Sequence, residues 1–308
     1  MDAHGNKTPI CYHVYQRSND GGLLFYCAKD FLVTYTIVSV CARKRGIIVL
    51  GFCQMFDHIH GLFVVQTPEE LSDFVRDYSA MIAREFNRAT GRTGPVLEHS
   101  FGRAAKVGDK IIRTALAYLY NNPVERKLCT RAEDYRWNYL AFARSKSPFS
   151  RPLVFRNAGI PMRKAIREVQ YVHRSGAFLN HTLLSRLFPR LDSQEINQLT
   201  DWIIHLWSFI SYDSAIRYYG SFDQMILAFA SNTGSEYDIR ESFDARSDQV
   251  YLKMTLLLMK AFPTLDPISV SAMDISKKIS LYWWLRDRTN ANSRQIEKYL
   301  HLQTIRHE

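Results

Sequence analysis

Two histidines interrupt an otherwise apolar run of the chain, QMFDHIHGLFVV at positions 54–65. Successive side chains of a β-strand point to opposite faces, so His58 and His60 are expected on one face, with Ile59 pointing into the core between them. Two neutral imidazoles held side by side can bind one divalent metal ion. The spacing fits equally well two partly exposed histidines with backbone partners, so further ligands have to come from elsewhere in the chain.

A second group that could do chemistry lies in the run AYLYNNPV at 117–124. On a helix, Tyr118 and Asn122 are four residues apart and share one face, so an amide oxygen and a phenol would lie one turn apart. A divalent cation stabilises the charge that develops on a phosphodiester, and a positioned tyrosine can act as a nucleophile. Together these residues indicate phosphoryl transfer to tyrosine. Taken singly, the tyrosine fits aromatic packing and Asn122-Pro123 fits a helix stop.

Four short motifs occur in order along the first half of the chain. They are YHVYQR at 12–17, MFDHIH at 55–60, YLYNNPV at 118–124 and DYRWN at 134–138. Over roughly residues 9–145 they resemble the single-tyrosine HUH transposases (IS200-like), and within these the chain is most similar to the REP-associated tyrosine transposases. Phe56 and Asp57 stand where that family has proline and asparagine, and Asn138 replaces its first serine after the tryptophan.

The resemblance implies an enzyme that nicks and rejoins single-stranded or hairpin (REP-like) DNA. In it, Tyr118 and the two histidines, His58 and His60, would be catalytic, and His58, His60 and Asn122 would hold Mg²⁺ or Mn²⁺. Tyr118 would form a 5′-phosphotyrosine link and free a 3′-OH. Tyr120 would point about 200° away on the helix and should not share the site. The alternative function is a DNA-binding regulator of the same fold with reduced or lost catalysis. Nothing in the sequence indicates the 2′-hydroxyl readout of an RNA nuclease.

Local patterns predict the elements that must position these residues. We expect strands over 11–17, 46–53 and 58–65 and helices over 29–43, 67–90 and 110–121. The helix after residue 66 begins with a capping box at Thr67 and Glu70 and ends at Gly91. Pro123 should stop the last helix. With the resemblance, these elements predict an α+β fold, a ferredoxin-like HUH domain with a central antiparallel sheet over 1–147.

The pattern changes at a polar, proline-containing stretch, 145–152, beyond which only helical periodicity appears. We therefore expect an all-helical domain over 148–308. Residues 279–302 predict a helix, a polar turn and a short helix with Ser293 as its N-cap, similar to a DnaA-like helix-turn-helix. In that arrangement Arg294, Gln295 and Lys298 would contact the major groove of duplex DNA. An ordinary helical hairpin fits the same pattern.

Charge favours a polyanionic partner for both parts of the chain. The chain carries 40 Lys and Arg against 30 Asp and Glu, with 20 against 14 in residues 1–150 and 20 against 16 in residues 151–308. A generally basic soluble surface would give the same balance. Further candidate DNA contacts are Arg17, Arg103, Lys106, Lys110 and Arg113 for phosphates and Trp137 for base stacking. Core packing fits Trp137 equally well.

Cysteine number and hydropathy indicate the cellular compartment of the protein. The five cysteines are odd in number and form no C-x-x-C pair, which favours a reduced compartment. The first ten residues have no apolar signal core, and no apolar run approaches the ~18 residues of a membrane span. We expect a cytoplasmic, bacterial, nucleoid-associated protein with no membrane partner, acting as a monomer or dimer.

Overall fold

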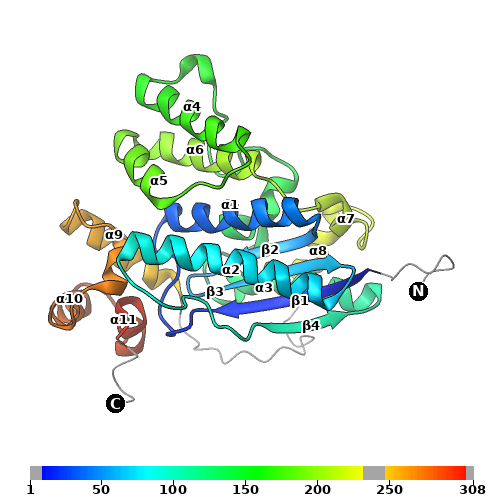
Figure 1. Ribbon diagram of the computed structural model, residues 1–308, viewed down its shortest axis with the longest axis horizontal. Helices are drawn as coiled ribbons and strands as arrows, with labels where there is room; N and C mark the ends of the chain where they lie inside the picture. Colours follow the sequence, from blue (N-terminus) through cyan, green and yellow to red (C-terminus); the bar gives the residue numbers. More distant parts are fainter. Residues whose placement is uncertain (1–8, 232–246, 303–308) are drawn as a thin grey trace.

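A four-stranded sheet forms the centre of the computed structural model, which describes residues 9–231 and 247–302. The strands are β1 (Ile10–Arg17), β2 (Ile48–Gln54), β3 (His58–Val65) and β4 (Gly102–Lys106). Their order is β2-β3-β1-β4 and every neighbouring pair is antiparallel. With α1 (Ala28–Arg45) between β1 and β2 and α2 (Pro68–Thr90) between β3 and β4, this is a ferredoxin-like βαββαβ arrangement (Figure 1). The predicted α+β fold is confirmed.

Strand alternation divides the buried side chains between the two faces of the sheet. Val14, Phe52 and Ile59 belong to the core under α1 and α2. Cys11, Cys53 and Leu62 belong to a second core under α3 (Asp109–Glu125). The sheet is therefore covered on both faces. Alternate residues along a strand pack against α1 and α2 on one face and against α3 on the other.

The helix α2 forms where its capping signals predict. Thr67 Oγ1 accepts a hydrogen bond from the Glu70 amide at 3.1 Å, which is the first half of the predicted capping box. Glu70 Oε2 accepts one from the Gln66 amide at 2.7 Å and not from the Thr67 amide that the box requires. Gly91 ends the helix in the left-handed region, at φ 79°, which glycine adopts without steric cost. The caps thus fix both ends of the helix that covers β3 and β1.

The helix α3 differs from the prediction at both ends. It begins after Gly108 and runs on through Pro123 to Glu125. Proline removes one N–H, but the amide of Arg126 still donates to Asn122 O at 3.0 Å and that of Leu128 donates to Pro123 O at 2.9 Å. The last turn is therefore closed from beyond the proline, and Asn122 keeps its helical register with the residues one turn before it. Strand β4 was not predicted, because its residues, GRAAK, have no β-branched or aromatic side chain.

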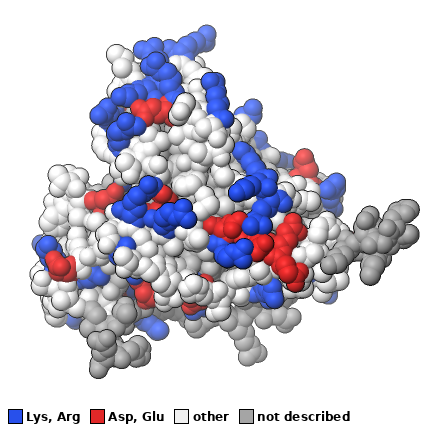
Figure 2. Space-filling model, viewed as in Figure 1, with Lys and Arg blue, Asp and Glu red and all other residues white. Residues whose placement is uncertain are grey.

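The rest of the chain is helical and packs at three places on the sheet and its helices (Figure 1). Helices α4 to α6 lie on the α1 side, α7 and α8 beside β2 and α3, and α9 to α11 near the turn between β2 and β3. Lys and Arg side chains gather over the part of the surface formed by α4 (Figure 2). The α-helices are α4 (Ile160–Arg174), α5 (His181–Leu187), α6 (Ser193–Leu206), α7 (Tyr212–Ile216), α8 (Phe222–Ser231), α9 (Gln249–Ala261), α10 (Ile275–Arg288) and α11 (Ser293–Leu300). The 3₁₀ segments are η1 (Ala132–Asp134), η2 (Arg136–Asn138), η3 (Leu140–Ala143), η4 (Phe155–Asn157), η5 (Phe188–Arg190) and η6 (Pro267–Ala272).

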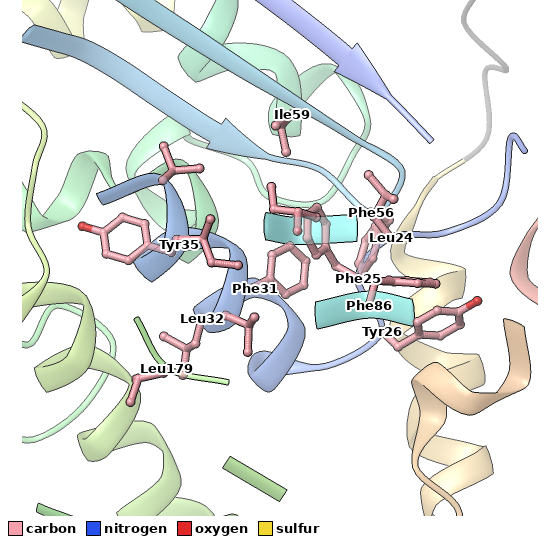
Figure 3. Close-up of a cluster of buried hydrophobic side chains, with 14 of the residues drawn as sticks. Leu24, Phe25, Tyr26, Phe31, Leu32, Tyr35, Phe56, Ile59, Phe86 and Leu179 are labelled. Carbon is pink, nitrogen blue, oxygen red and sulfur yellow. The ribbon is translucent and has the colours of Figure 1, made fainter. Parts of the chain in front are cut away.

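Buried side chains continue across the predicted domain boundary at residue 148. Ser39 of α1 donates to the carbonyl of Trp207 at 2.6 Å, and Tyr35 donates to that of Ile204 at 3.2 Å. Leu179 lies close to α1 in the same apolar cluster (Figure 3). The helices after residue 148 therefore complete the core of the sheet-bearing part. Within residues 9–231 and 247–302, no helix is both long and apolar enough to cross a membrane.

Candidate active site

The two predicted histidines lie side by side on the α3 face of β3. His58 and His60 are 1% and 0% exposed, and their ring centroids are 4.9 Å apart. Ile59, between them, points to the opposite face, among the apolar side chains of α1 and α2 (Figure 3). The placement predicted from strand alternation is confirmed.

Helix α3 brings the predicted tyrosine and amide to these histidines. The side-chain nitrogen Nδ2 of Asn122 lies 3.2 Å from His60 Nε2, and the Tyr118 ring lies 5.5 Å from the His60 ring. Both side chains are buried, at 0% and 1% exposure. Tyr120 faces away, with its hydroxyl 3.5 Å from the carbonyl of Leu50, and burial raises its pKa well above the ordinary value. The structure thus separates the two tyrosines of the motif as predicted.

A third histidine, His13, joins the cluster and was not predicted from the sequence. His13 Nε2 lies 3.2 Å from His60 Nδ1, and the His13 ring meets that of Tyr118 edge-on at 5.7 Å. Burial, then the charge of Lys106, lowers the pKa of His13 to about 3. Tyr15, two residues along β1 and so on the same face, lies 5.2 Å from the His58 ring. The signal was present in the YHVYQR motif, but only the register of β1 against β3 brings it to the site.

Asp57, one of the departures from the family pattern, holds His58 from behind. Its Oδ1 lies 2.7 Å from His58 Nδ1, and its Oδ2 is paired with Lys298 of α11. Burial raises the pKa of the Asp57 carboxyl, but the charges of Lys298 and His58 outweigh it, so the net pKa lies well below its ordinary value. A carboxylate behind an imidazole fixes the tautomer and orientation of a metal-binding histidine. Asp57 is therefore placed to orient His58.

Phe56, the neighbouring residue that differs from the family pattern, packs against the C-terminal helix α9. It is 2% exposed, and its ring contacts Tyr251 of α9 at 5.5 Å and Phe31 of α1 at 6.1 Å. The third departure, Asn138, is fully buried and donates to the carbonyl of Ala132 at 2.6 Å. All three residues that differ from the family pattern thus have partners inside this chain.

Side-chain atoms at the site fit a divalent metal ion. His58 Nε2 and Asn122 Oδ1 are buried and have no hydrogen-bond partner among the described residues. Burial, then the charge of His58, lowers the pKa of His60 well below its ordinary value, so this imidazole is neutral, which is the form that binds metals. The described part of the chain contains no cluster of three or more His, Cys, Asp or Glu side chains of metal-binding geometry. The buried, unpaired Oδ1 of Asn122 would supply a third protein ligand.

The predicted phosphate contacts lie along β1, β4 and the first turns of α3. Arg17, Arg103 and Lys110 are exposed, whereas Lys106 and Arg113 are half-buried. The Arg17 guanidinium lies 5.1 Å from the Tyr15 ring. Trp137 instead stacks on Phe31 at 4.4 Å, which is core packing and argues against base stacking by this indole.

The two helices of the predicted helix-turn-helix, α10 and α11, are present, with Asn292 rather than Ser293 as the N-cap. Arg294 is exposed. Gln295, however, is 6% exposed and donates to the carbonyl of Ser247, and Lys298 is paired with Asp57. This placement argues against groove contacts for Gln295 and Lys298, because both side chains point into the protein.

No protein-family model matches the chain, and no similar curated protein was found. Among solved structures, the chain is similar to a REP-associated tyrosine transposase bound to a REP hairpin. That match has a TM-score of 0.35 and 15% sequence identity, and it covers 44% of this chain and 80% of the other. The ferredoxin-like fold of this chain is assigned from its own strand order, β2-β3-β1-β4, and not from that match.

Proposed function

We propose that this protein is a metal-dependent DNA nickase and strand transferase that acts on single-stranded or hairpin DNA through a tyrosine. The observation that carries the proposal is the convergence of Tyr118, His58, His60 and Asn122, from two separate elements, at one buried point. Structural packing alone gives no reason for buried His58 Nε2 and Asn122 Oδ1 atoms to lack hydrogen-bond partners, since buried polar groups are normally paired.

In the proposed reaction the phenol oxygen of Tyr118 bonds to the phosphorus of a backbone phosphodiester, and the bond from phosphorus to the 3′ oxygen breaks. The phenol loses a proton and the departing 3′ oxygen takes one up. The products are a 5′-phosphotyrosine and a free 3′-OH, and attack by a 3′-OH on the phosphotyrosine rejoins a strand. Because one phosphodiester is exchanged for another, no nucleotide cofactor is needed.

The surrounding residues hold the reacting groups in place. His58, His60 and Asn122 would hold Mg²⁺ or Mn²⁺, which supplies positive charge beside the phosphate when bound. Asp57 fixes the orientation of His58 through Nδ1, and His13 contacts Nδ1 of His60. His58 Nε2 is left without a hydrogen-bond partner among the described residues, and His60 Nε2 faces the Asn122 amide nitrogen at 3.2 Å. Hydrogen bonds to the far side of a metal-binding imidazole orient its ring and raise the affinity of the site for the metal ion.

Burial of the tyrosine favours a second candidate function. Tyr118 is 1% exposed, and nicking requires its hydroxyl to reach a phosphate of a polymer. If the closed arrangement persists when DNA binds, the protein would act as a hairpin-DNA-binding regulator without nicking. The two functions share the DNA partner and differ only in whether a covalent bond forms.

The test is incubation of the full chain with Mn²⁺ and a labelled hairpin oligonucleotide, followed by denaturing electrophoresis. A protein–DNA band in the wild type that disappears in Tyr118→Phe supports the enzyme. Tyr120→Phe is the matched control, because it removes a hydroxyl from the same helix on the opposite face and should leave the band intact. Binding of the hairpin in a native gel without a covalent band would support the regulator and exclude the enzyme.

A further inference from the structure

Positive charge is concentrated in one short segment of the chain. Residues 151–190 contain eight Lys and Arg and one acidic residue, Glu168, a net charge of +7 in a chain of net +10. This segment forms η4, α4, α5 and η5. Figure 2 shows Lys and Arg gathered around one acidic patch in the part of the surface where Figure 1 places α4.

The cations of α4 lie in one stripe. At 100° per residue, Arg163, Arg167 and Arg174 fall within about 40° of one another around the helix, and Lys164 lies within about 100°. All four are exposed. The opposite face carries Met162, Ala165, Ile166 and Val169, which are buried. Core packing therefore fixes which way the stripe faces, and at 1.5 Å per residue it runs about 17 Å along the helix.

The neighbouring elements extend this stripe and do not neutralise it. Glu168 is paired with Arg186 of α5. Glu195, at the start of α6, accepts a hydrogen bond from the Asp192 amide in a capping box. At the C-terminal end of α4, the guanidinium of Arg43 lies 3.5 Å from His173, which continues the positive surface onto α1. The carboxylates of Glu168 and Glu195 are thus already engaged by partners of their own.

Two exposed apolar side chains border the cations. Tyr171 is 76% exposed and Ile160 is 75% exposed, and both fall in the same arc of the helix as Arg163 and Lys164. A tyrosine among arginines is common at nucleic-acid surfaces, where its hydroxyl and ring meet phosphate and sugar. Duplex DNA carries one phosphate charge per about 1.7 Å of its axis when both strands are counted, so a stripe of about 17 Å spans about ten phosphates.

We infer that the α4 stripe, Arg163, Lys164, Arg167, Arg174 and Tyr171, binds the phosphate backbone of double-stranded DNA. The inference rests on the proposed function in one respect, that DNA is the polyanion. Helices α6 and α1 lie between α4 and the sheet (Figure 1), whereas Tyr118 lies on the α3 face of that sheet. The stripe therefore holds a duplex segment other than the strand at Tyr118.

The test is fluorescence anisotropy of a labelled DNA duplex of arbitrary sequence with the full chain at several salt concentrations. Because each phosphate contact contributes about 0.9 to the slope of log K against log salt, the triple variant Arg163→Gln, Arg167→Gln, Arg174→Gln should lower that slope by about 3. Affinity at low salt should fall at least tenfold. Unchanged affinity and slope would overturn the inference.

The matched control removes three exposed cations elsewhere: Lys253→Gln and Lys260→Gln on α9 with Lys277→Gln near the start of α10. This variant has the same net charge as the α4 variant. A much smaller loss in the control than in the α4 variant supports the stripe. Equal losses in both would show that net charge alone attracts the duplex, which would contradict a defined surface.

Two further measurements separate this inference from other outcomes. The α4 variant should still form the Tyr118 adduct with a short hairpin, so loss of duplex binding and loss of nicking are distinguishable. Vesicles of phosphatidylserine and phosphatidylcholine test the rival partner, an anionic membrane, to which Ile160 and Tyr171 would contribute apolar contacts. Vesicle binding that depends on the three arginines, without duplex binding, would overturn the inference in favour of a lipid surface.

Discussion

Replacing Lys298 by methionine tests whether the C-terminal helix α11 sets the geometry of the candidate metal site. Lys298 is paired with Asp57, and Asp57 in turn holds His58 Nδ1 at 2.7 Å. The lysine and aspartate side chains are 23% and 18% exposed, so the pair is largely screened from solvent. Methionine keeps the length and apolar stem of lysine and removes only the charge and its hydrogen bonds.

The expected size of the effect follows from this burial. A hydrogen bond to a charged group contributes about 1.5–3 kcal/mol, so we expect the free energy of unfolding to fall by about 2 kcal/mol. Loss of a contact behind a metal ligand costs roughly 10–100-fold in metal affinity. Because Asp57 still bonds His58 directly, the lower end applies, and the dissociation constant for Mn²⁺ should rise about tenfold, or ~1.4 kcal/mol.

Isothermal titration with Mn²⁺ and urea unfolding of the same samples measure the two effects separately. Lys298→Arg should restore both, because a guanidinium can pair with the same carboxylate. Lys277→Met is the matched control, since its ion pair with Asp274 is 70% and 75% exposed and contributes little. Reduced stability with unchanged Mn²⁺ affinity would show that the ion pair only anchors α11 and does not set the geometry of the metal site.

Three further predictions concern His58, Gly22 and Asp20. His58→Ala should weaken Mn²⁺ binding at least tenfold and abolish the covalent adduct, and an adduct at wild-type yield would contradict the metal role. A Cβ added to Gly22 would lie 2.3 Å from the His301 ring, so Gly22→Ala should lower stability by about 1–3 kcal/mol in urea unfolding, whereas Gly102→Ala, with only ordinary contacts, should not. The pKa of Asp20 is held well below its usual range: burial raises it, but bonds to His301 and the other partners outweigh that. The folded state therefore takes up its proton at lower pH than the unfolded state, and stability is lost as pH falls below about 4. Asp20→Asn should flatten that acid limb of the urea-unfolding profile, and an equally steep limb in both proteins would contradict the assignment.

Local rules of the backbone were sufficient to predict part of the site. Alternation along a strand placed His58 and His60 on one face, and helical spacing placed Tyr118 with Asn122. Both depend only on residues close in sequence. The capping of α2 at Thr67 was predicted for the same reason, because a cap involves neighbours three or four residues away.

Contacts between distant segments could not be predicted in this way. His13 reaches His60 only through the register of β1 against β3, which the chain sets through the packing of both sheet faces. Lys298 lies 241 residues from Asp57, and no periodicity connects them. From the sequence, Phe56 and Asp57 were only two residues that differ from a family pattern. In the structure Phe56 packs against Tyr251 of α9, and Asp57 pairs with Lys298 of α11.

Pro123 shows how tertiary context overrides a local rule. The residue before a proline is disfavoured in a helix, and the sequence predicted a stop there. Donors from Arg126 and Leu128 close the last turn, and Asn121 donates its side chain to the carbonyl of Phe229 in α8 at 2.9 Å. The helix therefore continues, and Asn122 stays beside His60.

In the proposed reaction the hydroxyl of Tyr118 becomes covalently bound to DNA. The most direct test of this step is mass spectrometry of the protein after incubation with Mn²⁺ and a hairpin oligonucleotide, nuclease trimming and proteolysis. We expect a nucleotide mass on the peptide containing Tyr118, with fragmentation placing it on that residue and not on Tyr120. A hairpin that is bound but leaves every peptide unmodified, or a nucleotide on another residue, would contradict this reaction.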